Sequence, residues 1–355
     1  MVRSGRGFRG LPKLAGLVAG IAVAVVQMAP PAMAVEKSRT VDSTGCTWGI
    51  HELPLPSGWS GGNVYSSDRH DSFAGSGVDA DGRTRPLVWR DGDVTVLDTP
   101  GGVGATAQDV NSRGDVVGVV FGEDTSTRGV LWHGGQMIDL PLLPGGGYAV
   151  PTAINNAGLI VGYAAGEDTS HAVAWSADSP QSIRDLGVVA GSAYLTDVTD
   201  QGTAVGWTET VGEEFRQEAI AGTVGEGLTA LPGPVPGTNS IARAAAGRYI
   251  VGSAVLTGGP EDLGGPVVWG PIGPRALPGP QATPYAVNVH GTVAGFDPDL
   301  GAAIWDGDNE QQLPALTAGD LFSTSATVVT DDDTVAGTSA DAQGRSRPVT
   351  WSCTV

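Results

Sequence analysis

Short apolar segments alternate with turns rich in glycine, asparagine and aspartate along most of the chain. The stretch Pro151–Gly187 shows the unit: an apolar segment ending at Ile154, a turn at Asn155–Gly158, then the strand-like runs LIVGY, AVAW and SIRDL, with the acidic loop GEDTS after the first run. No segment has the length or the periodicity of a helix. Four short strands in one meander predict a β-propeller blade.

The unit recurs along the chain in three columns that share one period of 42 to 46 residues. One column is the glycine that closes the second strand: Gly75, Gly118, Gly162, Gly206, Gly252, Gly295 and Gly337. Another is the tryptophan that ends the third strand, with Ala221 in its place in the fourth copy: Trp89, Trp132, Trp175, Trp269, Trp305 and Trp351. The third is a Leu-Pro or Leu-Gly pair after the fourth strand. Together they predict an all-β, seven-bladed propeller of four-stranded blades.

The seventh copy lacks a fourth strand, because it stops soon after Trp351. The N-terminal segment Trp48–Pro56, WGIHELPLP, resembles QMIDLPLLP of the second copy. We therefore expect the N-terminal strand to complete the last blade and close the ring. A disulfide between Cys46 and Cys353 would join the two ends at this seam.

The chain begins with a segment typical of a secretory signal peptide. Four basic residues precede the apolar run Leu14–Val26, and Ala32-Met33-Ala34 is the small-x-small pattern that a signal peptidase cleaves. We expect residues 1–34 to be removed after Ala34, 35–45 to be flexible, and 46–355 to form an extracellular propeller without a membrane span. The alternative of a lipid anchor at Cys46 is disfavoured, because charged residues separate it from the apolar run.

Without its first 34 residues the chain has 15 basic and 38 acidic residues, a net charge of −23. Such a charge repels phosphate backbones and argues against a nucleic-acid partner. We expect a monomer whose partner is an extracellular glycan or protein of unknown identity.

The acids concentrate in the loops between the second and third strands of the copies. Strand alternation places these loops on one face of the ring, where they would form a crown of carboxylates. That crown is a candidate binding site for Ca²⁺, a cationic polymer or a basic protein surface; the alternative is ordinary turn composition. No ordered calcium-loop spacing is present, and no other cofactor is expected. The residues concerned are Asp79, Asp81, Glu123, Asp124, Glu167, Asp168, Glu213 and Glu214.

Local catalytic motifs are not found: the histidines lack zinc spacing, and no G-x-S-x-G occurs. Polar residues that interrupt the inner strands are Asp109, Asp197 and Arg243. Two functions stay open. The preferred one is a non-catalytic binding or interaction module for a glycan, a protein or a cation at the loop face. The alternative is an extracellular lyase or glycosidase that uses carboxylates of several blades with His133 or His171.

The third copy resembles a known bacterial extracellular family. Ala153-Ile154-Asn155, Ile160-Val161-Gly162, His171-Ala172-Val173-Ala174-Trp175 and Asp185-Leu186-Gly187 are similar to the HAF repeat. Val173 replaces the family's phenylalanine, and the histidine occurs in one copy only. The resemblance implies a secreted propeller-like repeat protein and no particular reaction.

Overall fold

A computed structural model describes residues 47–354 except 101–102, 123–125, 211–214 and 258–263. The described residues belong to one compact unit, Asp42–Val355. The predicted signal peptide, the segment 35–45 and Cys46 lie outside the described residues. Within the described part, no helix is long and apolar enough to cross a membrane.

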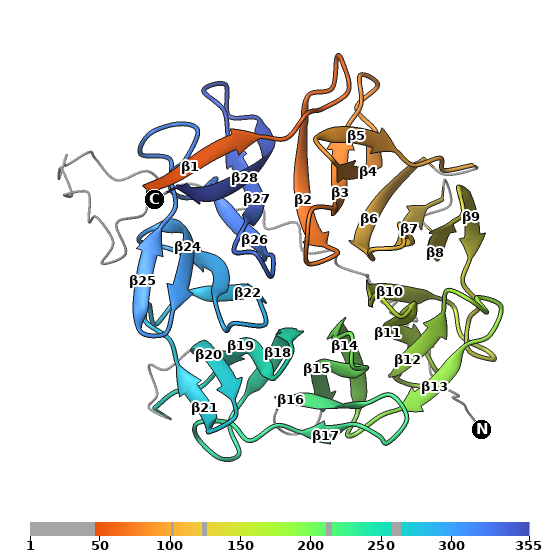
Figure 1. Cartoon of the computed structure of the whole chain (residues 1–355). Helices are drawn as coiled ribbons and strands as arrows, with labels where there is room; N and C mark the ends of the chain where they lie inside the picture. The colour runs from red at the N-terminus through yellow and green to blue at the C-terminus, as the bar shows by residue number, and fades with distance from the viewer. Residues whose placement is uncertain (1–46, 101–102, 123–125, 211–214, 258–263, 355) are drawn as a thin grey trace, which may run out of the picture. The chain divides into compact units, whose positions relative to one another are not determined.

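The described residues form seven antiparallel sheets of four strands, arranged as the blades of a ring (Figure 1). The seven-bladed all-β propeller is therefore confirmed. Blade 1 contains β2 (Gly61–Ser67), β3 (Phe73–Val78), β4 (Thr84–Arg90) and β5 (Asp93–Val96); blade 2 contains β6 (Gly104–Val110), β7 (Val116–Phe121), β8 (Thr127–His133) and β9 (Gln136–Asp139). Blade 3 contains β10 (Ala149–Ile154), β11 (Leu159–Ala165), β12 (Ser170–Ser176) and β13 (Arg184–Gly187); blade 4 contains β14 (Ser192–Val198), β15 (Thr203–Thr210), β16 (Arg216–Thr223) and β17 (Thr229–Ala230). Blade 5 contains β18 (Ser240–Ala246), β19 (Tyr249–Ala254), β20 (Gly265–Gly270) and β21 (Gly273–Ala276); blade 6 contains β22 (Thr283–Val287), β23 (Val293–Asp297), β24 (Gly301–Asp306) and β25 (Asn309–Gln312). Blade 7 contains β26 (Ser325–Val329), β27 (Val335–Ala340), β28 (Ser346–Thr354) and, as its outer strand, β1 (Thr47–Glu52).

Blade 7 confirms the predicted closure, because its outer strand comes from the other end of the described chain (Figure 1). β1 pairs antiparallel with β28, and Trp48 lies opposite Cys353. An ion pair between Arg347 Nε and Glu52 Oε2, 2.8 Å long, links the same two strands. The disulfide to Cys46 stays a prediction.

The hydrophobic core is distributed between the blades. Each of seven clusters of buried apolar residues in the described chain combines side chains from two neighbouring blades, including the pair of blades 7 and 1. Trp175, for example, packs with Leu131 and Val117 of the preceding blade. Its indole N–H donates to the carbonyl oxygen of Pro141 at 3.2 Å, just after the preceding outer strand. The tryptophan column therefore joins blades by packing and by a hydrogen bond, which recurs with similar geometry at Trp89, Trp132, Trp269 and Trp351.

The prediction that Ala221 takes the tryptophan position in the fourth copy is wrong by one residue. Gly162 pairs with Val173, two residues before Trp175, whereas Gly206 pairs with Ile220, two residues before Gly222. Gly222 is therefore the equivalent residue. A Cβ at Gly222 would lie 2.0 Å from the carbonyl oxygen of Gly227, so the turn backbone occupies the space that tryptophan fills elsewhere.

Every inner strand carries a β-bulge at the same position, opposite the glycine column. A bulge leaves one residue unpaired and increases the local twist. In blade 3 the bulged residue is Thr152, and a Cβ on the facing Gly162 would lie 2.0 Å from the carbonyl oxygen of Val150. Close approach of the inner strand therefore requires glycine there. The seven bulge residues are Tyr65, Gln108, Thr152, Thr196, Arg243, Tyr285 and Thr327.

Candidate functional site

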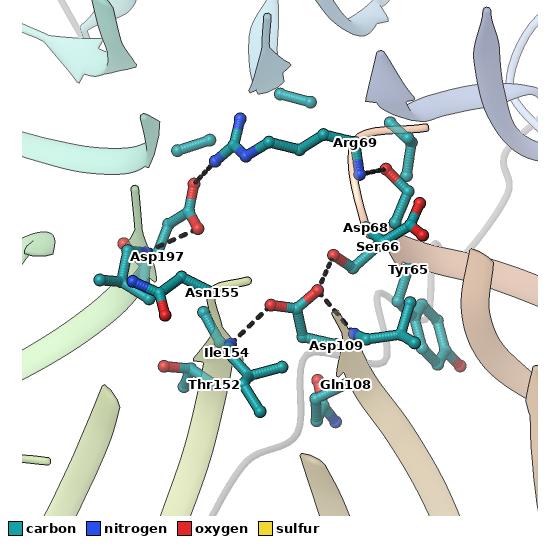
Figure 2. A pocket seen from close by; sticks show the side chains of 18 of the residues that line it. Tyr65, Ser66, Asp68, Arg69, Gln108, Asp109, Thr152, Ile154, Asn155 and Asp197 are labelled. Carbon is teal, nitrogen blue, oxygen red and sulfur yellow. Dashed lines mark hydrogen bonds and ion pairs between the residues drawn. The ribbon is translucent and has the colours of Figure 1, made fainter. Parts of the chain in front are cut away.

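A cavity of about 320 Å³ lies where the inner strands of all seven blades meet their first turns. We call it the axial cavity. All seven bulge residues line it, so the bulges turn their side chains toward the axis. Figure 2 shows polar side chains from several blades converging on this space.

The three threonines among the bulge residues connect neighbouring blades. Thr152 Oγ1 donates to the carbonyl oxygen of Leu195 at 2.9 Å, and Thr196 Oγ1 donates to that of Ala242 at 3.2 Å. Thr327 Oγ1 makes the equivalent bond across the seam, to Val64 at 2.8 Å. These three hydroxyls therefore have a structural role in joining the blades.

Asp109 and Asp197 also connect blades, in the same way as each other. Figure 2 shows the link from Asp109 to Ile154. Asp109 Oδ2 accepts from the backbone N–H of Ile154 in the next blade at 2.7 Å, and Asp197 Oδ2 accepts from that of Ala245 at 2.8 Å. The other oxygen of each carboxylate accepts the N–H of the following residue, and Asp109 Oδ1 also accepts the hydroxyl of Ser66. Both aspartates therefore have a structural explanation.

Asp109 nevertheless differs from an ordinary carboxylate. It is 6% exposed, and this burial raises the pKa of Asp109 to about 7. The Ser66 hydroxyl and the Ile154 N–H lower the pKa, while the negative charge of Asp197 raises it. A group with such a pKa exchanges its proton near neutral pH.

Arg69 crosses the axial cavity from blade 1 to the opposite blades (Figure 2). It lies in the turn after β2, and its backbone has a φ of 73°. Its Nη2 donates to the carbonyl oxygen of Ala245 at 2.6 Å and lies 3.8 Å from Asp197 Oδ2. The side chain therefore spans the channel and partly neutralises Asp197.

Arg243 is the exception among the charged residues of the axial cavity that the structure describes. It is the bulge residue of blade 5 and is half-buried, yet it makes no hydrogen bond or ion pair with any residue that the structure describes. Its Nε is fully buried without a partner. Burial lowers the pKa of the Arg243 guanidinium, whereas the neighbouring Tyr285 raises it. A buried donor without a partner costs about 1–3 kcal/mol, so Arg243 is poised to accept an anion.

The described hairpin loops between second and third strands, such as residues 79–83, lie at the opposite end of the blades from the turns that line the axial cavity. Asp79 closes its own hairpin: Oδ1 accepts the N–H groups of Asp81 and Arg83, and Oδ2 pairs with Arg85 Nε at 2.8 Å, which holds the pKa of Asp79 below its usual value. Asp81 is exposed. The structure therefore supports the alternative of turn chemistry at this hairpin.

Of the other predicted loop acids, Glu167 and Asp168 are exposed, whereas Glu123, Asp124, Glu213 and Glu214 lie outside the described residues. The described residues contain no group of three or more histidine, cysteine, aspartate or glutamate side chains suited to a metal ion. The carboxylate crown stays a prediction.

The two histidines considered for catalysis lie outside the axial cavity. His133 Nδ1 contacts Asp115 Oδ1 at 2.6 Å, and His171 Nδ1 contacts the carboxylate of Asp185 at 3.0 Å. Each therefore pairs with an acid of its own blade, away from Asp109.

Arg243, Asp109 and Asp197 were recognisable in the sequence because they interrupt apolar inner strands. Arg69, Tyr65 and Tyr285 were not recognised. The available signal was the bulge column, in which threonine recurs and Tyr65, Gln108, Arg243 and Tyr285 depart from it.

No family model matches the chain, and no curated protein matches it either. Solved β-propeller structures do. Streptogramin B lyase is 14% identical with a TM-score of 0.57, covering 86% of this chain and 98% of its own. Oligogalacturonate lyase in complex with manganese is 12% identical with a TM-score of 0.58, covering 87% and 96%. The β-propeller domain of the Trilobed protease from Pyrococcus furiosus is 10% identical with a TM-score of 0.54, covering 80% and 90%. At these identities the likeness establishes the fold alone. The resemblance to HAF repeats stays a prediction.

Proposed function

We propose that this propeller is a non-catalytic binding module whose ligand is a small organic anion, held in the channel by Arg243. The observation that carries the proposal is the guanidinium of Arg243, whose Nε is buried and which has no hydrogen-bond partner among the described residues. A carboxylate or phosphate oxygen would supply the missing acceptor, and a charge-assisted bond of this kind is about twice as strong as a neutral one.

The remaining polar groups of the axial cavity favour binding over chemistry. Four of these side chains already form hydrogen bonds between blades: Asp109, Asp197, Thr152 and Thr196. A reaction that engaged them with a substrate would break hydrogen bonds that join the blades. Arg69 is held by Ala245 and Asp197. The cavity of about 320 Å³ is at the small end of the ligand pockets of roughly 300–1,000 Å³ found in proteins.

Calorimetric titration of the purified protein with acetate, citrate, phosphate and sulfate tests the proposal. We expect one of these anions to bind and Arg243→Gln to weaken it at least about tenfold, as expected for a hydrogen bond to a charged group. Arg275→Gln is the matched control, because Arg275 is an exposed arginine paired with Asp308. Equal losses in both variants, or binding unchanged in Arg243→Gln, would contradict the proposal.

A second candidate is an enzyme that uses Asp109 as a general acid or base. The pKa of about 7 in a cavity favours it, since acid–base catalysts work best with a pKa near the working pH. Turnover that follows a pKa near 7 and disappears in Asp109→Asn, with folding intact by circular dichroism, would establish this function in place of pure binding.

We also propose that the protein is exported to an oxidising compartment and that Cys46 and Cys353 form a disulfide there. The pairing of β1 with β28 supports it, because Trp48 lies opposite Cys353 and Cys46 is two residues before Trp48 in the sequence. Intact-mass measurement of the exported protein tests it: alkylation only after reduction is expected. Alkylation without reductant, or an added lipid mass, would contradict the disulfide.

A further inference from the structure

A second cavity of about 280 Å³ lies beside the first, and Arg243 lines both. We call it the side cavity. It is formed by β18, β19, the start of β16 and the segment before β22. Besides Arg243, the polar residues that line it are neutral: Gln217, Asn239, Ser240, Ser253, Gln281 and Thr283.

Most of these neutral side chains have unused hydrogen-bonding capacity, although Ser240 Oγ accepts the backbone N–H of Ala219 at 3.0 Å. Gln217, Ser253, Gln281 and Thr283 make no side-chain hydrogen bond with any residue that the structure describes. Asn239 uses only Oδ1, which accepts the backbone N–H of Gln217 at 3.0 Å. Four of the six neutral side chains of the side cavity thus have no partner among the described residues, whereas the threonine and aspartate side chains of the axial cavity are engaged in linking blades.

We propose that the side cavity binds the hydroxyl groups of a sugar acid whose carboxylate pairs with Arg243. This inference rests on the proposed anion-binding function and names its ligand class. Amide and hydroxyl side chains both donate and accept hydrogen bonds, which matches a sugar hydroxyl that does the same. An apolar acid has no hydroxyl groups to bond with the neutral polar lining. A neutral sugar has no charge to pair with Arg243.

Three probes of similar size separate the contribution of the carboxylate to binding from that of the hydroxyl groups. D-glucuronate has both, D-glucose lacks the carboxylate, and cyclohexanecarboxylate lacks the hydroxyls. Each is titrated calorimetrically into the full mature chain. We expect glucuronate to bind at least about tenfold more tightly than either of the others, because a hydrogen bond contributes roughly a factor of five and several form together.

Variants assign the effect to the side cavity. Gln281→Ala and Ser253→Ala should each weaken glucuronate binding roughly fivefold, the loss of about one neutral hydrogen bond, and leave cyclohexanecarboxylate binding unchanged. Gln201→Ala is the matched control, because Gln201 is exposed on a turn of blade 4 and lines neither cavity. Thermal melting of each variant verifies that it folds.

The outcomes separate the two proposals. If glucuronate and cyclohexanecarboxylate bind equally and Arg243→Gln abolishes both, the anion site stands and the sugar-acid inference is overturned. If glucuronate and glucose bind equally and Arg243→Gln changes neither, the anion site and the inference are both overturned. Absence of binding by glucuronate also overturns the inference.

Discussion

Asn155 Nδ2 donates to the carbonyl oxygen of Thr199, 44 residues further along the chain, at 2.9 Å. The same side chain closes its own turn, since Oδ1 accepts the N–H groups of Ala157 and Leu159. One buried asparagine therefore shapes a turn and joins two blades. The turn at Asn155–Gly158 was predicted from the sequence, whereas the link between blades was not. Equivalent links run from Asn111 to Asn155 and from Asn288 to Thr330.

Asn155→Ala should lower the free energy of unfolding by roughly 2–3 kcal/mol, because it leaves buried backbone groups without partners. Urea unfolding followed by tryptophan fluorescence measures the change. Asn309→Ala, at an exposed position of β25, serves as the control and should stay within about 0.5 kcal/mol of the parent. Similar losses in the two variants would refute the linking role.

Gly162→Ala should prevent the folding of blade 3 or lower the stability by about 3 kcal/mol or more, because its Cβ would lie 2.0 Å from the Val150 carbonyl oxygen. Gly147→Ala provides the comparison, since no atom lies within 4 Å of a Cβ there. The melting temperatures of the two variants, each compared with the parent, measure the difference. A Gly162→Ala protein that melts with the parent would show that the strand bulge can relax.

Asp109 should make stability depend on pH in a defined direction. Its pKa is raised from 3.8 to about 7 on folding, so between these values the folded protein holds a proton that the unfolded chain has released. The stability contributed by this proton is full below about pH 4 and is lost as the pH rises to about 7. Urea unfolding across this range should show the parent losing stability relative to Asp109→Asn. Parallel curves for the parent and Asp109→Asn would contradict the raised pKa.

The repeating features could be predicted from the sequence, because each blade repeats the same local requirements. The glycine and tryptophan columns follow from spacing, and the closure by Trp48–Pro56 follows from its likeness to the end of the second copy. The error at Ala221 arose because strand register, and not distance along the chain, decides that Gly222 takes the tryptophan position.

The site was less predictable because it forms only when the ring closes. Arg69 reaches Asp197 and Ala245 across the channel, and no periodic pattern relates blade 1 to blades 4 and 5. Arg243 was identifiable as an interruption of an inner strand. Its lack of a partner among the described residues could only be learned from the structure.

The central claim, that Arg243 receives the anionic group of a ligand, is tested most directly by the NMR signal of its Nε–H group. This signal is assigned by its disappearance in Arg243→Lys and followed during titration with D-glucuronate. We expect a saturable shift of the Arg243 Nε–H signal as the guanidinium gains an anionic acceptor. A ligand that saturates the protein and leaves this signal in place would contradict it.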